Sequence, residues 1–201
     1  GKTTVVVKRV KNLIEKYNVN PAEITVITFT KAAAVQMQQR FEDLSLNCSK
    51  GVSFGTFHAL FFKILRMARG ISLENVMKED DGWNILRNFI KQEEINVFDE
   101  DEYIKDFFKN KSLMKNELLD IKSFNPTGLS KDEFSLLLKK FEDYKERHQL
   151  IDFDDMLVEC YYELLNNTDI LSFWQNKCKF LLIDEFQDIN NAQYQCVKLL
   201  A

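Results

Sequence analysis

Residues 180–188 read FLLIDEFQD, and this stretch constrains the fold more than any other part of the chain. Four apolar residues, too few for a helix, run directly into two adjacent carboxylates, Asp184 and Glu185. Such a run is typical of a strand buried on both faces of a parallel sheet. Ligands of open α/β sheets bind at the carboxyl ends of the strands. We therefore expect Asp184 to hold a divalent cation and Glu185 to orient and deprotonate a water. The alternative is an acidic strand-to-turn junction without a ligand.

The first four residues, GKTT, match the end of the phosphate-binding loop pattern G-x-x-x-x-G-K-[ST]. In that pattern backbone N–H groups at a helix start hold phosphate oxygens, the lysine reaches the outer phosphates and the hydroxyl binds magnesium. Apolar residues follow at helical spacing: Val6, Val10, Leu13, Ile14 and Tyr17. Lys2 and Thr3 at one end of the chain, with Asp184 and Glu185 at the other, form a complementary set for a magnesium nucleotide.

The composition sets broad limits on the class of protein. With 201 residues, 45% of them hydrophobic, the chain can build one sizeable core or two small packed units. It has no apolar run long enough for a membrane span and no signal peptide, although a missing signal at residue 1 says little about the parent protein. From its cysteines we expect a cytoplasmic protein. Because residue 1 lies inside a motif, we expect a fragment of a longer protein. The scattered cysteines predict reduced, mostly packed thiols rather than zinc ligands or disulfides: Cys48, Cys160, Cys178 and Cys196.

The net charge of −4 is unevenly distributed. Residues 1–70 carry 11 basic and 4 acidic side chains, whereas the remainder carries 16 basic and 27 acidic ones. A basic first third attracts a phosphate backbone locally. A solvated basic face explains the same pattern equally well, so charge alone does not decide between them.

The first 70 residues alternate between helix and strand patterns. Residues 24–29 are a β-branched run typical of a central strand, and residues 52–54 predict another short strand. Thr30 and Thr56 stand where each would cap a following helix. The apolar faces predicted for those helices are Ala34, Met37, Phe41 and Leu44, then Leu60, Phe61, Ile64, Leu65 and Ala68. This alternation indicates a parallel sheet with crossover helices.

After Gly70 the pattern becomes helical, without a convincing strand before His148. Apolar spacing predicts helices around residues 83–90, 103–108, 118–121 and 134–144. Ser130 and Glu133 predict a capping box, and residues 125–128 (NPTG) predict a loop. We expect an all-helical domain inserted between two halves of an α/β domain. The expected boundaries are 1–71 and 150–201 for the α/β domain and 72–149 for the insertion.

Residues 152–155 (DFDD) open a further predicted helix. Its acids, Asp152, Asp154 and Asp155, stand at the positive end of the helix dipole, and we favour capping over metal binding for them. A short helical piece near residues 171–174 and a final helix from about residue 193 complete the pattern.

Five blocks, in order along the whole chain, resemble the motifs of one family, the UvrD/Rep-like superfamily 1 DNA helicases. They are residues 1–3 (motif I), 27–34 with Met37 and Arg40 (motif Ia), 55–58 (motif Ib), 150–157 (the return from an inserted helical domain) and 184–190 (motif II). The resemblance implies a RecA-like P-loop NTPase sheet, domain 1A, with an inserted 1B-like helical subdomain, truncated at both ends.

The resemblance also implies ATP-driven movement along single-stranded DNA, usually 3′ to 5′, with strand separation at duplex junctions and with ATP and Mg²⁺ as cofactors. By position, Lys2 would contact the outer phosphates and Thr3 and Asp184 would bind magnesium. Glu185 would be the general base and Gln187 would sense the terminal phosphate. Gly1 and Thr4 complete the implied nucleotide-binding set.

Five residues are implied at the single-strand track: Phe29, Thr30, Thr56, Phe57 and His58. Aromatic faces stack on bases without reading sequence, while hydroxyls and backbone N–H groups hold phosphates. From the residues alone, core packing remains the alternative for Phe29 and Phe57. The alternative for His58 is a packed, hydrogen-bonded histidine.

The chain departs from the family pattern at several points. The start of the phosphate-binding loop and the upstream glutamine that reads adenine are missing, and Gln36 stands where the family commonly has Glu. Motifs III to VI, which supply the arginine fingers and a second RecA-like domain, are absent. Because phosphoryl transfer depends on such cations, we expect the isolated chain to be inactive and the second RecA-like domain of the same protein to be its partner.

Three other readings compete with the helicase. One is the helicase part of a RecB- or AddA-type helicase–nuclease, and another is a non-catalytic nucleotide- or DNA-binding scaffold of the same fold. The intact Lys2, Asp184 and Glu185 argue against the scaffold. A small-molecule kinase with a P-loop disagrees with the motif II, Ia and Ib blocks.

Overall fold

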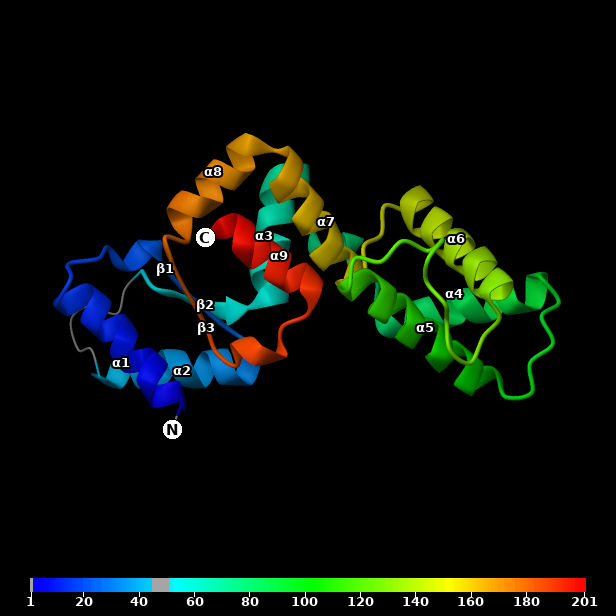
Figure 1. The fold of residues 1–201 in the computed structure, drawn as a ribbon, viewed down its shortest axis with the longest axis horizontal. Helices are drawn as coiled ribbons and strands as arrows, with labels where there is room; N and C mark the ends of the chain where they lie inside the picture. Colours follow the sequence, from blue (N-terminus) through cyan, green and yellow to red (C-terminus); the bar gives the residue numbers. More distant parts are fainter. Residues whose placement is uncertain (1, 45–50) are drawn as a thin grey trace.

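The computed structural model describes residues 2–44 and 51–201, and in it strands from the first and last parts of the chain pair in one parallel sheet (Figure 1). Within those residues the strand order is β2-β1-β3, with β1 (Ile24–Thr28) between β2 (Ser53–Thr56) and β3 (Phe180–Ile183). Ile27 is in register with both Gly55 and Ile183, so all three strands end at the same edge. The predicted α/β class and the central position of β1 are confirmed.

The strands differ in how deeply they are buried. Every residue of β1 is buried, whereas all four residues of β2 and of β3 are partly exposed. The expectation that residues 180–183 are buried on both faces is therefore wrong. The physical reason is position in the sheet, because β3 pairs with β1 alone among the described strands.

Helices cover both faces of this sheet (Figure 1). On one face lie α1 (Lys2–Glu15) and α2 (Lys31–Leu44), which share a core with β1. That core contains Val7, Val10, Ile14, Ile24, Val26, Met37 and Phe41. Tyr17, predicted on the apolar face of the first helix, lies past the helix end and is exposed. On the other face lie α3 (Phe57–Arg69), α7 (Phe153–Asn166), α8 (Thr168–Lys177) and α9 (Asn191–Leu200). Short 3₁₀ turns occur at η1 (Pro21–Glu23), η2 (Leu73–Asn75) and η3 (Phe186–Asp188).

Residues 72–149, which we call the helical block, contain α4 (Glu79–Gln92), α5 (Glu100–Asn116) and α6 (Lys131–Arg147). These helices pack around their own apolar cluster, and they lie to one side of the remaining described residues, which we call the sheet part (Figure 1). The cluster includes Leu86, Ile90, Ile104, Phe107, Phe134, Leu137 and Phe141. The chain enters and leaves the block side by side, since Met77 N donates to Ile151 O at 2.9 Å and Ile151 N donates to Asn75 O at 2.7 Å.

One helix predicted in the block does not form. Residues 118–121 are a turn, because α5 ends at Asn116 and Leu118 takes a positive φ of 54°. The predicted loop at residues 125–128 is present, and Gly128 accounts for its backbone path with a φ of 80°.

The described cysteines are packed thiols, as the sequence predicts. Cys160, Cys178 and Cys196 are free and buried, and Cys48 lies outside the described residues. Among residues 2–44 and 51–201, no helix has the length and apolar character needed to cross a membrane.

Candidate functional site

The carboxylate pair after β3 lies at the carboxyl edge of the sheet. Asp184 N donates to Ile27 O at 2.9 Å, which continues the ladder one residue past the end of β3. Asp184 therefore stands level with Thr28 at the end of β1. Its side chain is partly exposed, so a ligand at this edge can reach it.

Glu185 marks an abrupt change in chain direction. Its φ of 54° and ψ of 45° lie in the left-handed region, which is costly for a residue with a side chain. Gln187 Nε2 donates to Glu185 Oε2 at 2.5 Å and to Asp188 Oδ2 at 3.2 Å. The turn thus brings an amide against the carboxylate that the sequence predicts to be a general base.

The first turn of α1 carries the remaining predicted nucleotide-binding residues. Thr3 and Thr4 are partly exposed there, at the positive end of the helix dipole. Gly1 lies outside the described residues, and only the backbone of Lys2 is described. Val7 and Val10 pack in the cluster that contains Ile24 and Val26, which fixes α1 against β1.

Threonine hydroxyls lie at the carboxyl ends of the other two strands, Thr30 two residues after β1 and Thr56 as the last residue of β2. Thr30 Oγ1 accepts from Ala33 N at 3.1 Å and so caps α2, while Thr56 Oγ1 accepts from Ala59 N at 3.2 Å and caps α3. Both caps agree with the sequence prediction. A capping hydroxyl keeps its own proton to donate, so each threonine can still offer a hydrogen bond to a ligand.

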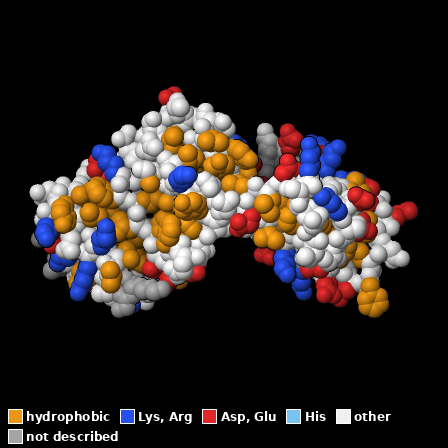
Figure 2. All heavy atoms as spheres, in the orientation of Figure 1, with side chains coloured by type: hydrophobic (Ala, Val, Ile, Leu, Met, Phe, Trp, Pro, Cys, Tyr) orange, Lys and Arg blue, Asp and Glu red, His pale blue; other side chains and the backbone are white. Residues whose placement is uncertain are grey.

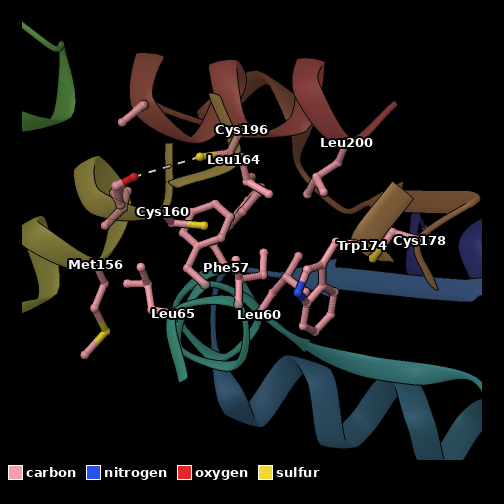
Figure 3. Packing of buried hydrophobic residues seen from close by; sticks show 14 of the residues in the cluster. Phe57, Leu60, Leu65, Met156, Cys160, Leu164, Trp174, Cys178, Cys196 and Leu200 are labelled. Atoms are coloured by element: carbon pink, nitrogen blue, oxygen red, sulfur yellow. Dashed lines mark hydrogen bonds between the residues drawn. The ribbon is translucent and has the colours of Figure 1, made fainter. Parts of the chain in front are cut away.

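The two phenylalanines predicted at the DNA track differ in exposure. Phe29 is 42% exposed, whereas Phe57 is 2% exposed. Their ring centroids lie 6.2 Å apart in an edge-on arrangement. Figure 3 shows Phe57 within the packed cluster near Leu60 and Cys160. Phe57 is therefore a core residue, the alternative that the sequence left open, and Phe29 is the accessible ring of the pair.

His58 is half-buried and has an aromatic neighbour that the sequence reasoning missed. Its ring lies edge-on to Phe153, with centroids 5.2 Å apart. Burial lowers the pKa of His58 below its ordinary value, and attraction to Asp154 offsets this only in part. Phe153 is 57% exposed although it stands at the first position of α7. The sequence signal that could have revealed this exposed ring is an apolar residue placed between the capping acids Asp152 and Asp155.

Two of the three acids around Phe153 are capping residues, as we favoured from the sequence, whereas Asp154 contacts Lys111 and Ser112 of α5. Asp152 and Asp155 form a reciprocal capping box, with Asp155 N donating to Asp152 Oδ1 and Asp152 N to Asp155 Oδ2, both at 2.9 Å. The sequence reasoning missed their second role. Lysines from the helical block also contact these acids, and in sequence they lie up to 43 residues away.

A parallel sheet with a carboxylate pair at its carboxyl edge, and with helices on both faces, defines an α/β protein consistent with a RecA-like helicase domain. The model of the UvrD/REP helicase N-terminal domain matches residues 1–201, and the chain belongs to this family.

Similar proteins align with the whole chain. The chain is 31% identical to a probable DNA helicase II homolog of Mycoplasma capricolum and 32% identical to the ATP-dependent DNA helicase Rep of Buchnera aphidicola subsp. Baizongia pistaciae. It is 28% identical to the ATP-dependent DNA helicase PcrA of Staphylococcus aureus. The chain covers 29%, 30% and 28% of these relatives, respectively, so it spans less than a third of their length.

Proposed function

We propose that the protein containing this chain is an ATP-dependent DNA helicase that moves 3′ to 5′ along single-stranded DNA and separates strands at duplex junctions. The chain supplies its amino-terminal ATP-binding part. The observation that carries this proposal is the carboxyl edge of the sheet. There the Asp184–Glu185 turn is level with the ends of β1 and β2, which lead into capping threonines and an exposed aromatic ring.

For the nucleotide half, we assign Gly1, Lys2, Thr3 and Thr4 to the phosphates of ATP, with Lys2 at the outer ones. A carboxylate oxygen of Asp184 and the hydroxyl of Thr3 suit Mg²⁺, which prefers oxygen ligands and keeps several waters. That chemistry fits the site, because Asp184 offers a partly exposed carboxylate at the carboxyl edge of the sheet and Thr3 a partly exposed hydroxyl in the first turn of α1. When bound, Mg²⁺ neutralises charge on the phosphates.

For the chemical step, we assign Glu185 as the general base that takes a proton from the attacking water. Gln187, whose amide contacts the Glu185 carboxylate, is placed to sense the terminal phosphate. Among the described non-glycine residues with positive φ, four lie just after helix ends, whereas Glu185 lies after a strand at the carboxyl edge, which supports a functional assignment.

For the DNA half, we assign Phe29, Thr30, Thr56 and His58 to the single-strand track. Phe29 offers a ring to a base, and the two threonines offer hydroxyl protons to phosphates. Phe57 supports Phe29 from the core rather than contacting a base itself.

We further propose that residues 1–71 and 150–201 form domain 1A and residues 72–149 the inserted, 1B-like subdomain. Their separate apolar clusters support this division. Because motifs III to VI lie outside residues 1–201, efficient ATP turnover requires a second RecA-like domain of the same protein.

The test is DNA-stimulated ATP turnover by the full-length protein with Lys2→Ala. We expect turnover to fall at least about 100-fold, because a positioned cation at the phosphates is lost. Lys8→Ala is the matched control, since Lys8 is an exposed lysine of the same helix, and it should stay near the wild-type rate. Retained turnover in Lys2→Ala contradicts the assigned role. A wild-type protein without any turnover favours the scaffold alternative.

A further inference from the structure

Ionic side chains are concentrated where the helical block meets the sheet part. Six of them form what we call the lysine–aspartate cluster: Lys111 and Lys115 of α5, Lys145 of α6, and Asp152, Asp154 and Asp155 at the start of α7. Every lysine comes from the block, and every aspartate comes from the helix that packs against α3 and α9. The cluster therefore spans the junction between the two parts.

Lys145 contacts both residues of the α7 capping box. Its Nζ lies 2.8 Å from Asp152 Oδ2 and 2.6 Å from Asp155 Oδ2. Lys115 Nζ contacts Asp155 and also lies 2.7 Å from Glu142 Oε1 of α6. Lysines from two helices of the block, α5 and α6, thus contact the first turn of α7 in the sheet part.

Lys111 provides the third connection. Its Nζ lies 3.0 Å from Asp152 Oδ2 and 2.6 Å from Asp154 Oδ2, and Ser112 Oγ donates to Asp154 Oδ1 at 2.8 Å. These bonds come from α5, whereas those of Lys145 come from α6, and both lysines contact Asp152 Oδ2. Contacts from two helices restrict rotation of the block as well as its separation.

The cluster is buried and charged. The side chains of Lys111 and Lys145 are only 2% and 3% exposed. Burial opposes the charged form of Lys111, but attraction to Asp152 and Asp154 prevails and raises the pKa of that lysine. The same lysines hold the pKa of Asp152 below its usual range despite burial. Apolar side chains could join the two parts with comparable stability, whereas paired charges specify one arrangement.

In sequence, Phe153 lies between the two capping acids, Asp152 and Asp155. Contacts that fix the backbone of these acids therefore also fix the Phe153 ring beside His58. Phe153 is exposed, and it borders a cavity of about 350 Å³ that is also lined by Trp83 and Phe108 of the block. The position of Phe153 at the edge depends on the first turn of α7.

Other contacts also join the two parts, since residues 75–77 bond to the backbone of Ile151 and Leu118 packs against the apolar cluster of the sheet part. Figure 2 shows the molecule narrowing to a waist between them. A second bridge crosses there, since Asn191 Nδ2 of α9 donates to Glu117 O, next to the end of α5, at 3.1 Å. The helix α5 therefore contacts the start of α7 directly. The end of α5 also lies beside the start of α9, the helix that follows the Asp184–Glu185 turn.

We propose that the lysine–aspartate cluster is a positioning element that fixes the helical block against the sheet part and thereby holds Phe153 beside His58 at the DNA-facing edge. The DNA-facing role of that edge rests on the proposed function. Lys145 is the main positioning residue, and it acts through Asp152 and Asp155 without contacting DNA or nucleotide.

The test uses Lys145→Met in the full-length protein, with Lys140→Met as the matched control. Lys140 is a lysine of the same helix, and its partner Glu93 lies within the block. Three quantities are measured: Kd for a fluorescent oligo(dT), Kd for a fluorescent ATP analogue without DNA, and the distance between spin labels at Asn88→Cys and Val35→Cys in a Cys48→Ser background. Asn88 of α4 and Val35 of α2 are exposed and outside the cluster.

We expect Lys145→Met to weaken oligo(dT) binding about tenfold, to leave nucleotide Kd within about twofold, and to broaden or shift the distance distribution. Lys140→Met should change none of the three. If Lys145→Met fails to fold, Asp154→Asn serves instead, because it removes one charge, keeps an oxygen for Ser112 and spares the capping box. An unchanged distance distribution overturns the proposal, as does an equal loss of nucleotide and DNA affinity. A wild-type protein that does not bind oligo(dT) contradicts the proposed function, and the distance distribution then decides the positioning role alone.

Discussion

At the scale of single residues, two side chains to which the motifs assign the same role differ in burial. Phe29 and Phe57 both follow strand ends, yet only Phe29 is accessible to a ligand. Phe57 lies at the first position of α3, where the helix direction turns its ring into the cluster shared with α7 and α9 (Figure 3). The motif therefore identifies the region of the structure in which a ligand contact is expected, and burial determines which side chain in that region a ligand can reach.

This difference predicts opposite phenotypes for two alanine variants. Phe57→Ala should lower the free energy of unfolding by about 3–5 kcal/mol, because it leaves a cavity in the core. Phe29→Ala should change stability little and weaken single-strand binding by about 1–3 kcal/mol, because a stacking ring is lost. Denaturant unfolding and oligo(dT) titration of both variants measure this. A stable Phe57→Ala with reduced DNA affinity would reverse the assignment.

At the scale of elements, a buried amide explains how the loop at residues 125–128 is held. Asn110 of α5 is buried, and its Nδ2 donates to Asp106 O and Thr127 O, each at 2.7 Å. Its Oδ1 accepts from Thr127 N at 2.9 Å. The Asn110 side chain thus bonds to both the N–H and the C=O of Thr127, as a neighbouring strand would, and holds the loop against the middle of α5.

We predict that Asn110→Ala lowers the free energy of unfolding by about 1–3 kcal/mol, because the two hydrogen bonds that the Asn110 amide makes with the backbone of Thr127 are lost. Asn116→Ala, on the same helix, is the control. Asn116 donates one bond to Ser112, and its Oδ1 has no partner among the described residues, so its loss should cost under about 1 kcal/mol. Equal costs in denaturant unfolding would show that the loop contacts do not matter.

Local sequence patterns predicted the helices, strands and caps better than they predicted how deeply each element is buried. The strands at residues 24–28 and 180–183 and the caps at Thr30, Thr56 and Asp152 depend on neighbouring residues, so sequence spacing revealed them. The exposure of β3, by contrast, depends on how many strands flank it.

Long-range contacts set the remaining features. Lys111 lies 43 residues from its partner Asp154, and no local pattern encodes that contact. Lys145, by contrast, lies only 10 residues from Asp155. The predicted helix at residues 118–121 failed for another reason: its apolar residues lie in a turn after α5 rather than on a helix face.

At the scale of the whole molecule, the carboxyl edge of the sheet, which is the candidate functional site, is built from distant segments. Residues 24–30, 53–58 and 180–188 meet there, and the helical block intervenes between the second and third of these. The block returns the chain beside its entry point through the Val76–Ile151 bridge, so the insertion leaves the strand register intact. A block joined in this way can contribute contacts to the edge while the sheet folds around its own core.

The most direct measurement of the central claim is ATP turnover by full-length Glu185→Gln in the presence of single-stranded DNA. We predict a fall of at least about 100-fold with nucleotide binding retained, because the amide keeps the shape of the side chain and cannot accept the proton. Glu23→Gln is the control, since Glu23 pairs with Lys179 at the opposite edge of the sheet, and it should turn over ATP like the wild type. Turnover by Glu185→Gln at the rate of Glu23→Gln would contradict the account.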